Sequence, residues 1–214
     1  MPKAPMDESE IAEKKEKIID IAAEIIMEEG FHNLSMRKIG MKIGMTAANL
    51  YNYYSNKDEL NIAIRTRAGK ILFDDLANAY RCGTTIAEKI ACMIEAYIRF
   101  GVCKANYYSI MFDMPTPKFA DYVGSPLEPL AREEKESSEK SIELLHECLL
   151  ALESEGYTLP ENKDLFLIML WSQLHGLISL YNNKLISEIH SDPETAIEDA
   201  KGLAHEIIFR FISG

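Results

Sequence analysis

The stretch from Ser35 to Leu60, SMRKIGMKIGMTAANLYNYYSNKDEL, limits more than any other what this chain can fold into. Ser35 can cap a first short helix, because its hydroxyl can accept a hydrogen bond from a free amide of the first helical turn. Gly44 ends that helix, since glycine tolerates the left-handed backbone of a tight turn, and Thr46 caps a second helix soon afterwards. Two helices this close in sequence cannot lie antiparallel. The stretch therefore predicts a sharply angled helix-turn-helix whose second helix runs from Ala47 to Tyr54.

Two further helices complete the predicted domain. Residues 10–29 carry an apolar stripe that can pack against the helix-turn-helix, and Gly30 ends this helix. Ser55 or Asn56 can cap another helix, which has Lys57 in its first turn and runs to about Tyr80. Its later part leaves the N-terminal domain and enters the rest of the chain.

The charge of this region differs from that of the whole chain. Residues 35–67 contain six basic and two acidic residues, a balance of +4, whereas the chain as a whole has a net charge of -11. A positive region on an acidic protein favours docking of a polyanion, because neutralising phosphates supplies much of the affinity for DNA. The alternative is three ordinary amphipathic helices with a solvated charged face, and the glycine turn and the two caps count against it.

The same residues resemble the DNA-binding domain of tetracycline-repressor-type (TetR-family) transcriptional regulators, over Ile18 to Leu60. The positions that the family favours are Gly30, Phe31, Ser35, Arg37, Ile39, Gly44, Thr46, Leu50, Tyr51, Tyr53, Tyr54, Lys57 and Leu60. Gly40 and Ile43 stand where alanines are usual, and Ala48 replaces a frequent glycine. These departures change packing volume and helix stability, and so bear on the docking angle more than on the fold.

The short second helix can present most of its face to the major groove of DNA. We expect the bases to be read by Thr46, Ala47, Asn49, Asn52 and Tyr53. The phosphates are assigned, partly through the family resemblance, to Arg37, Tyr51 and Lys57, and Ser35 completes the predicted DNA-binding set. One short helix reads too few base pairs for useful specificity, so we expect a homodimer on a near-palindromic operator of double-stranded DNA.

The remainder of the chain is also predicted to be helical, which makes the protein all-α with about nine helices. We expect a DNA-binding domain in residues 1–60 and an effector-binding and dimerisation domain in residues 61–214. The family resemblance places the dimer interface in the last two helices, and the apolar content of Leu174, Ile178, Tyr181, Ala204, Ile207, Ile208 and Phe211 fits it.

Aromatic and methionine side chains are concentrated in the second domain. The segment LWSQLHGLISL resembles the C-terminal WxxxHG signature of a TetR subgroup, and its Trp171 and His175 lie one helical turn apart. We expect a small-molecule effector to bind among Tyr97, Phe100, Tyr107, Met111, Phe112, Phe119, Tyr122, Trp171 and His175; the alternative is that these residues simply fill the core. Residues 69–214 carry 13 basic and 23 acidic residues, which favours an apolar or cationic effector over an anionic one.

Other classes of protein find little support in the sequence. Phosphate loops, nucleophile elbows and metalloprotease motifs are missing, so we predict no enzyme, no cofactor and no metal site. The four cysteines are widely spaced, which favours buried reduced thiols over a redox sensor. Neither a secretory signal nor a membrane-spanning run is recognised, which predicts a cytoplasmic protein. The sequence thus predicts a ligand-responsive DNA-binding regulator, a repressor released by its effector; the alternative is a helical sensor or interaction module that has lost DNA binding.

Overall fold

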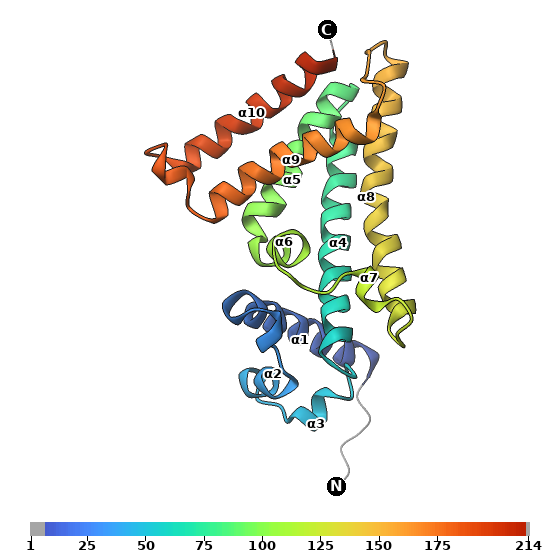
Figure 1. The fold of residues 1–214 in the computed structure, drawn as a ribbon, viewed down its shortest axis with the longest axis vertical. Helices are drawn as coiled ribbons and strands as arrows, with labels where there is room; N and C mark the ends of the chain where they lie inside the picture. The colour runs from blue at the N-terminus through green and yellow to red at the C-terminus, as the bar shows by residue number, and fades with distance from the viewer. Residues whose placement is uncertain (1–6, 213–214) are drawn as a thin grey trace. The chain divides into compact units, whose positions relative to one another are not determined.

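The structure is a computed structural model that describes residues 7–212, without the side chains of residues 207, 208, 211 and 212. This part of the chain contains ten α-helices, two 3-10 helices and no strand, which confirms the predicted all-α class. The helices are α1 (Glu8–Glu29), η1 (Phe31–Asn33), α2 (Met36–Ile43), α3 (Ala47–Leu50), α4 (Lys57–Cys82), α5 (Ile86–Cys103), α6 (Ala105–Phe112), α7 (Phe119–Tyr122), α8 (Glu128–Ser154), α9 (Lys163–Asn182), η2 (Ile186–Glu188) and α10 (Pro193–Ile212), shown in Figure 1.

Two of these helices differ from the sequence-based expectation. The second helix of the helix-turn-helix ends at Leu50 instead of Tyr54, and the chain continues through a turn in which the Tyr53 amide donates to the Leu50 carbonyl at 2.9 Å. The sequence did not predict the short helix α7. It forms because the Asp121 carboxylate accepts a hydrogen bond from the backbone N–H of Lys118 at 2.8 Å and so satisfies a free amide at its start.

The chain forms two compact units. The first unit comprises Met1–Gly69, of which residues 7–69 are described, and Asn106–Ser137; the second comprises Lys70–Ala105 and Ser138–Gly214. The helices α4 and α8 therefore each contribute residues to both units. This division is not the functional boundary after residue 60 that the sequence led us to expect, and the assignment of DNA binding and effector binding to either side of that boundary stays a prediction.

The core of the first unit joins α1 to the helix-turn-helix. Side chains of α1 are fully or almost fully buried and include Ile18, Ala22, Ile25 and Ile26. Ile39 of α2, Leu50 of α3 and Leu60 of α4 are all 0% exposed. A smaller apolar cluster in the same unit brings Ile62 together with Tyr122 and Ala131, so the segment 106–137 packs onto the first part of α4.

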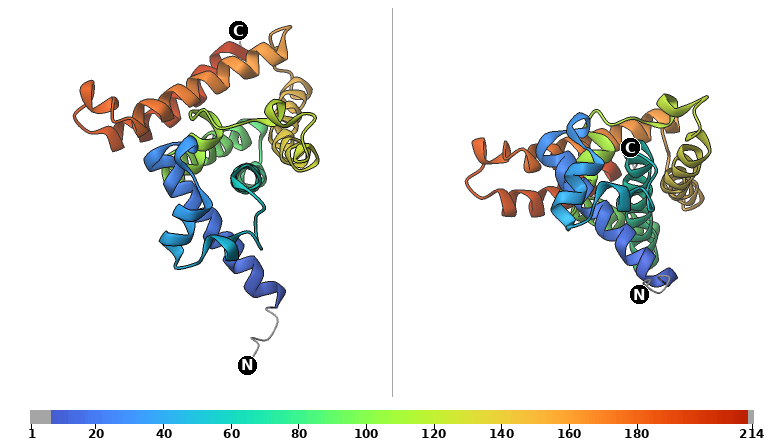
Figure 2. Two further views of the ribbon diagram at one scale, coloured as in Figure 1. Left: turned by 60° about the horizontal axis from the view of Figure 1, so that its bottom comes forward. Right: turned by 90° about the horizontal axis from the view of Figure 1, so that it is seen from below.

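The second unit is built on close packing among α5, α9 and α10. The last two helices run alongside each other and are joined by the segment that contains η2 (Figure 2). Gly101 of α5 lets α9 approach closely, because a Cβ at this position would lie 2.7 Å from the side chain of Ile178. The side-chain amide of Asn182 donates to the Gly101 carbonyl at 3.1 Å. Ile178, which we predicted at the dimer interface, is instead fully buried within its own unit, because it fills the space that Gly101 leaves.

Candidate functional site

The helix-turn-helix is held by side-chain caps at each helix start. The Ser35 hydroxyl accepts from the Lys38 amide at 3.3 Å, and the Thr46 hydroxyl accepts from the Asn49 amide at 3.2 Å. Gly44 has a φ of 72°, in the left-handed region that glycine adopts without strain. The caps and the turn residue predicted from the sequence are therefore all present.

Gly40 accounts for one departure from the family pattern. Its carbonyl accepts a hydrogen bond from the Met45 amide at 2.8 Å, and a Cβ on Gly40 would lie 2.4 Å from the Met45 carbonyl oxygen. An alanine at this position would therefore require the turn between α2 and α3 to shift. The glycine brings the two helices closer together than an alanine would allow.

Most of the predicted DNA-binding residues lie at the surface. Arg37, Thr46, Asn49, Tyr51 and Asn52 are exposed, while Ser35, Ala47 and Lys57 are partly exposed. Tyr53 was wrongly placed on the reading surface: it is only 5% exposed, because the turn after Leu50 directs it into the core of the first unit. Ala48, which we did not assign, is exposed on α3 beside Asn49, and its exposure follows only from the helix orientation in the structure.

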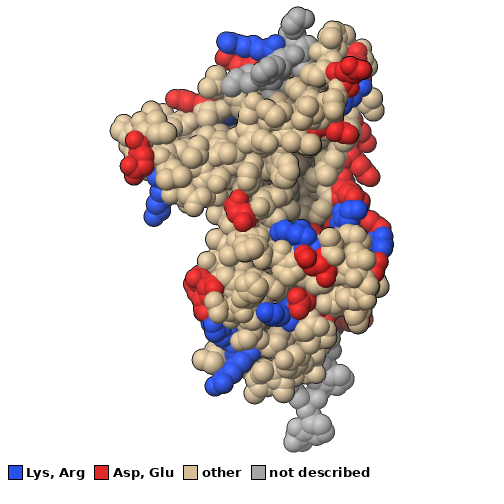
Figure 3. Space-filling model, viewed as in Figure 1, with Lys and Arg blue, Asp and Glu red and all other residues tan. Residues whose placement is uncertain are grey.

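The basic residues of the helix-turn-helix region are not equally available. Lys38 forms an ion pair with Glu29, and Lys42 forms one with Glu28 at 3.0 Å. Acidic residues of α1 therefore neutralise both lysines of α2. Hydrogen bonding to Glu28 raises the pKa of Lys42. Figure 3 shows Lys and Arg side chains gathered over α2 with acidic side chains beside them.

Two basic residues further along α4 are also paired. Arg67 contacts Glu16 at 3.0 Å and Asp20 at 2.8 Å, and Arg65 contacts Glu134 at 3.1 Å. Among the residues that the structure describes, Arg37 and Lys57 have no acidic partner. The balance of +4 counted along the sequence thus reduces to two cations without an acidic partner, Arg37 on α2 and Lys57 at the start of α4, and these are two of the three residues assigned to phosphate.

The start of α4 carries a reciprocal cap. The Asn56 side chain accepts from the amides of Asp58 at 3.0 Å and Glu59 at 2.8 Å, and the Glu59 carboxylate accepts from the Ser55 amide at 2.7 Å. These bonds fix the first turn of the helix and therefore the position of the Lys57 backbone next to the helix-turn-helix.

The predicted effector residues are divided between the two units. Tyr97, Phe100, Trp171 and His175 belong to the second unit, and Tyr107, Met111, Phe112, Phe119 and Tyr122 belong to the first. In the second unit the Trp171 indole N–H donates to the Tyr97 hydroxyl at 2.6 Å, and the ring centroids of Trp171 and His175 are 6.1 Å apart. The structure therefore brings Tyr97, Trp171 and His175 together, and the sequence predicted this proximity for Trp171 and His175. Phe100, another residue of the predicted effector set, is only 1% exposed.

In the first unit, two of these residues contact residues next to the helix-turn-helix. The Tyr107 hydroxyl donates to Asp20 at 2.9 Å, and the Arg67 guanidinium lies 5.4 Å from the Tyr107 ring centroid. The Tyr122 hydroxyl accepts a hydrogen bond from the side-chain amide of Asn61 at 3.1 Å. Burial and the hydrogen bond to Asp20 raise the pKa of Tyr107. These two tyrosines tie the segment 106–137 to α1 and α4.

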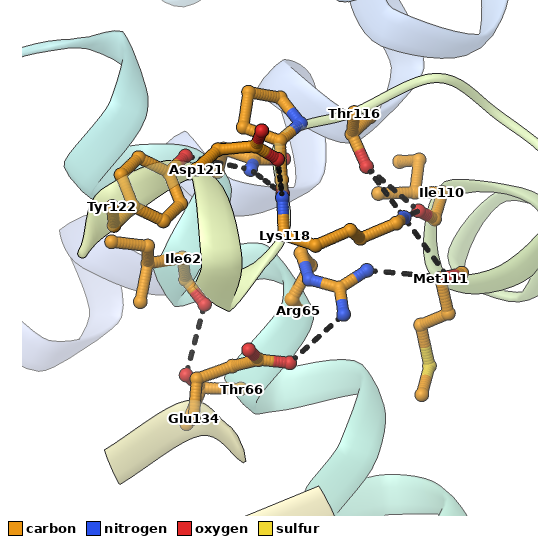
Figure 4. Close-up of polar contacts among 12 residues, drawn as sticks. Ile62, Arg65, Thr66, Ile110, Met111, Thr116, Lys118, Asp121, Tyr122 and Glu134 are labelled. Atoms are coloured by element: carbon orange, nitrogen blue, oxygen red, sulfur yellow. Dashed lines mark hydrogen bonds and ion pairs between the residues drawn. The ribbon is translucent and has the colours of Figure 1, made fainter. Parts of the chain in front are cut away.

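The first unit also contains a buried polar cluster that the sequence did not predict, drawn together with Tyr122 in Figure 4. The Arg65 and Glu134 side chains are 13% and 5% exposed, and Arg65 also donates to the Met111 carbonyl at 3.2 Å. The Lys118 ammonium donates to the Met111 carbonyl and to the Thr116 hydroxyl, each at 3.1 Å. Burial, together with the charge of Arg65, lowers the pKa of Lys118 to about 8. The Arg65 Nε and Asn61 Oδ1 atoms are buried without a hydrogen-bond partner.

Outside these residues, the structure shows a surface depression and free cysteines. A surface depression of about 520 Å³ is lined by Gly124, Ser125, Glu128, Pro129, Arg132, Glu133 and Glu136, none of which belongs to the predicted effector set. Within residues 7–212, outside the four side chains excluded above, no cluster of metal-ligating side chains is found.

All four cysteines are free thiols. Cys148 is buried, but Cys82 and Cys103 are exposed, so the expectation of buried thiols is wrong for these two.

Comparison with known proteins identifies related regulators. A sequence model described as "Bacterial regulatory proteins, tetR family" matches residues 18–64, and one described as "Tetracyclin repressor-like, C-terminal domain" matches residues 90–200. The HTH-type transcriptional activator FasR of Mycolicibacterium smegmatis is 25% identical over 114 residues, which are 53% of this chain and 49% of FasR. The fatty acid metabolism regulator protein of Bacillus subtilis is 28% identical over 82 residues, which are 38% of this chain and 42% of that protein.

A solved structure shares the fold over most of the chain. The fatty acid degradation regulator FadR from Bacillus halodurans superposes with a TM-score of 0.65 and 20% sequence identity, covering 95% of this chain and 96% of FadR. The two curated relatives are matched over less than half of their own length, so they bear on part of the protein, and the FadR comparison shows the shared fold.

Proposed function

The chain belongs to the tetR family of bacterial regulatory proteins, and from this premise we propose how this transcriptional regulator reads DNA and what releases it. Regulators of this family bind DNA operators and small-molecule effectors and form dimers. We propose that α3 enters the major groove with Thr46, Ala47, Asn49 and Asn52 towards the bases. The observation that carries this proposal is that Arg37 and Lys57, on the two helices that flank α3 in the chain, have no acidic partner among the described residues.

Removing a phosphate contact and removing a base contact should have different effects on DNA binding. Lys57→Ala should weaken binding to all DNA sequences alike and reduce the slope of log affinity against log salt by about one unit for each bound subunit, because each subunit loses one phosphate interaction. Asn49→Ala should instead change the preferred base at one position of each half-site. Fluorescence anisotropy with labelled duplexes over a salt series measures the first effect, and selection from random DNA measures the second.

Lys38 provides a matched control for Lys57, because it lies in the same domain but is paired with Glu29. Lys38→Ala should leave the salt slope unchanged. If Lys57→Ala behaved like Lys38→Ala, the phosphate role of Lys57 would be wrong. If the wild-type protein selected no sequence and bound no duplex, the alternative of a helical sensor without DNA binding would replace the proposal.

We propose that the protein is a repressor whose effector has an apolar body and is neutral or cationic. The acidic balance of residues 69–214 supports this charge preference, and the names of two relatives, a fatty acid metabolism regulator and a fatty acid degradation regulator, support an acyl chain. The Trp171, Tyr97 and His175 side chains of the second unit are proposed to contact it.

Operator selection in the presence of candidate effectors tests this proposal. A neutral acyl ester or an alkylammonium ion should release the protein from its selected operator, and a free fatty acid should do so less well. Release by the free fatty acid alone would overturn the charge preference. An increase in operator affinity with the ester would contradict release of the protein by its effector.

We further propose a homodimer through α9 and α10, in the cytoplasm. By length and composition, α9 is the one helix in the described part of the chain that could cross a membrane. Its apolar stretch has a mean hydropathy of 1.2, and only 11% of this stretch is buried. Its exposed large apolar side chains are Leu165, Ile168, Met169, Trp171 and Leu180. Nothing lies within 4 Å of a Cβ built on Gly176, so a second helix can approach there closely. A second copy would remove this apolar surface from water, and paired heads would read half-sites about 34 Å apart.

A further inference from the structure

Phe31 and Lys57 meet next to the helix-turn-helix, although they come from different segments of the first unit. Phe31 follows Gly30, whose φ of 83° turns the chain out of α1, and its side chain is only 6% exposed. The Lys57 ammonium lies 4.8 Å from the centroid of the Phe31 ring. This distance is within the range of a cation–π interaction. The ring is therefore fixed in the core, while the ammonium above it remains partly exposed.

The local environment of Lys57 does not otherwise favour this position. Lys57 is the first residue of α4, and a helix N-terminus carries partial positive charge that repels a cation. The neighbouring Glu59 carboxylate is occupied by the Ser55 amide and hydroxyl. Lys57 also has no acidic partner among the described residues, in contrast to Lys38 with Glu29. The Phe31 ring is thus the contact that holds the Lys57 ammonium.

We propose that Phe31 is a positioning residue for DNA binding: its ring holds the Lys57 ammonium where a DNA phosphate is contacted. This inference rests on the proposed phosphate role of Lys57. A carboxylate partner would also order the lysine, but it would neutralise the charge, as it does for Lys38 and Lys42. An aromatic face orders the long side chain and leaves its full charge for the phosphate. Because the Lys57 side chain is already ordered in the free protein, less conformational entropy is lost when DNA binds.

The test compares Phe31→Leu, which keeps an apolar core residue, with Phe31→Tyr, which keeps the ring face. Affinity for a fluorescein-labelled duplex of random sequence is measured over a series of KCl concentrations, because a phosphate contact does not require the operator. Phe31→Leu should weaken binding by about two- to tenfold with an unchanged salt slope, since the ion contact is still made but is no longer preorganised. Phe31→Tyr should restore binding. Lys57→Ala should reduce both affinity and slope, and Phe31→Leu should add nothing to it in the double variant.

A matched control lies in the second unit, where the Lys89 ammonium lies 4.6 Å from the centroid of the Tyr80 ring. Tyr80→Leu removes a contact of the same kind away from the helix-turn-helix and should leave DNA affinity unchanged. In the wild-type protein, NMR should show the ε-methylene protons of Lys57 shifted upfield by the ring current of Phe31, and this shift should disappear in Phe31→Leu and persist in Phe31→Tyr.

The outcomes separate this inference from the proposed function. If Lys57→Ala weakens DNA binding but Phe31→Leu does not, or if the two effects simply add, Phe31 has only a core role and the inference is overturned while the DNA-reading proposal stands. The absence of an upfield shift in the wild-type protein overturns it as well, whatever the stability of the variants. If Lys57→Ala has no effect on any duplex, the phosphate role itself fails, and the inference fails with it.

Discussion

Replacing Glu134 with leucine should lower the free energy of unfolding by about 3–5 kcal/mol, because it leaves the Arg65 guanidinium charged and unpaired in a buried site. The Arg65 and Glu134 side chains are 13% and 5% exposed and lie 3.1 Å apart. Lys118 is nearby and is itself partly desolvated, so its positive charge adds to the repulsion. The free energy is measured by urea unfolding, followed by circular dichroism at a fixed protein concentration, since the proposed dimerisation would make stability concentration-dependent.

The double variant Arg65→Met with Glu134→Leu is the matched control. Replacing both partners of a buried ion pair with apolar residues is often neutral or stabilising, so most of the stability should return. The Met111 carbonyl, which accepts from Arg65, keeps a donor because Lys118 also donates to it at 3.1 Å. A decrease of less than about 1 kcal/mol in the single variant, the value of a surface ion pair, would mean that the contact is solvated in solution.

Replacing Met169 with glutamate should weaken the proposed dimer by roughly a hundredfold or more, because two-fold symmetry would place one added carboxylate from each subunit in the proposed apolar interface. Met169 is 54% exposed on α9, among the exposed apolar side chains of that helix. Sedimentation at micromolar concentration should then show a monomer. Affinity for a two-half-site operator should fall with it, whereas the much weaker binding of one head to random DNA should remain.

Leu150 on α8 provides the control for this substitution. It is also apolar and even more exposed, at 61%, but it does not belong to the proposed interface. Leu150→Glu should therefore leave the dimer and operator binding intact. A Met169→Glu protein that remained dimeric, beside a Leu150→Glu protein that became monomeric, would move the interface from α9 to α8.

Local sequence signals carried most of the information about the DNA-binding head. Ser35, Gly44 and Thr46 act through hydrogen bonds and dihedral angles within a few residues of themselves, and the structure has these caps and this turn where the sequence placed them. The proposed effector site was less accessible to the same reasoning. Tyr97 and Trp171 form a hydrogen bond across two helices, and no pattern along the chain distinguishes such a pair from ordinary core aromatics.

The sequence by itself determined the all-α class, the helix-turn-helix and the family, because helix periodicity, caps and turn residues are properties of neighbouring residues. Only the tertiary structure decided which cations remain available to DNA. The acidic partners of Lys42 and Arg65 come from α1 and α8, outside the counted stretch, so a count of charge along residues 35–67 could not include them. The burial of Tyr53 and the contact of Phe31 with Lys57 likewise depend on how separate segments pack, which local propensity does not encode.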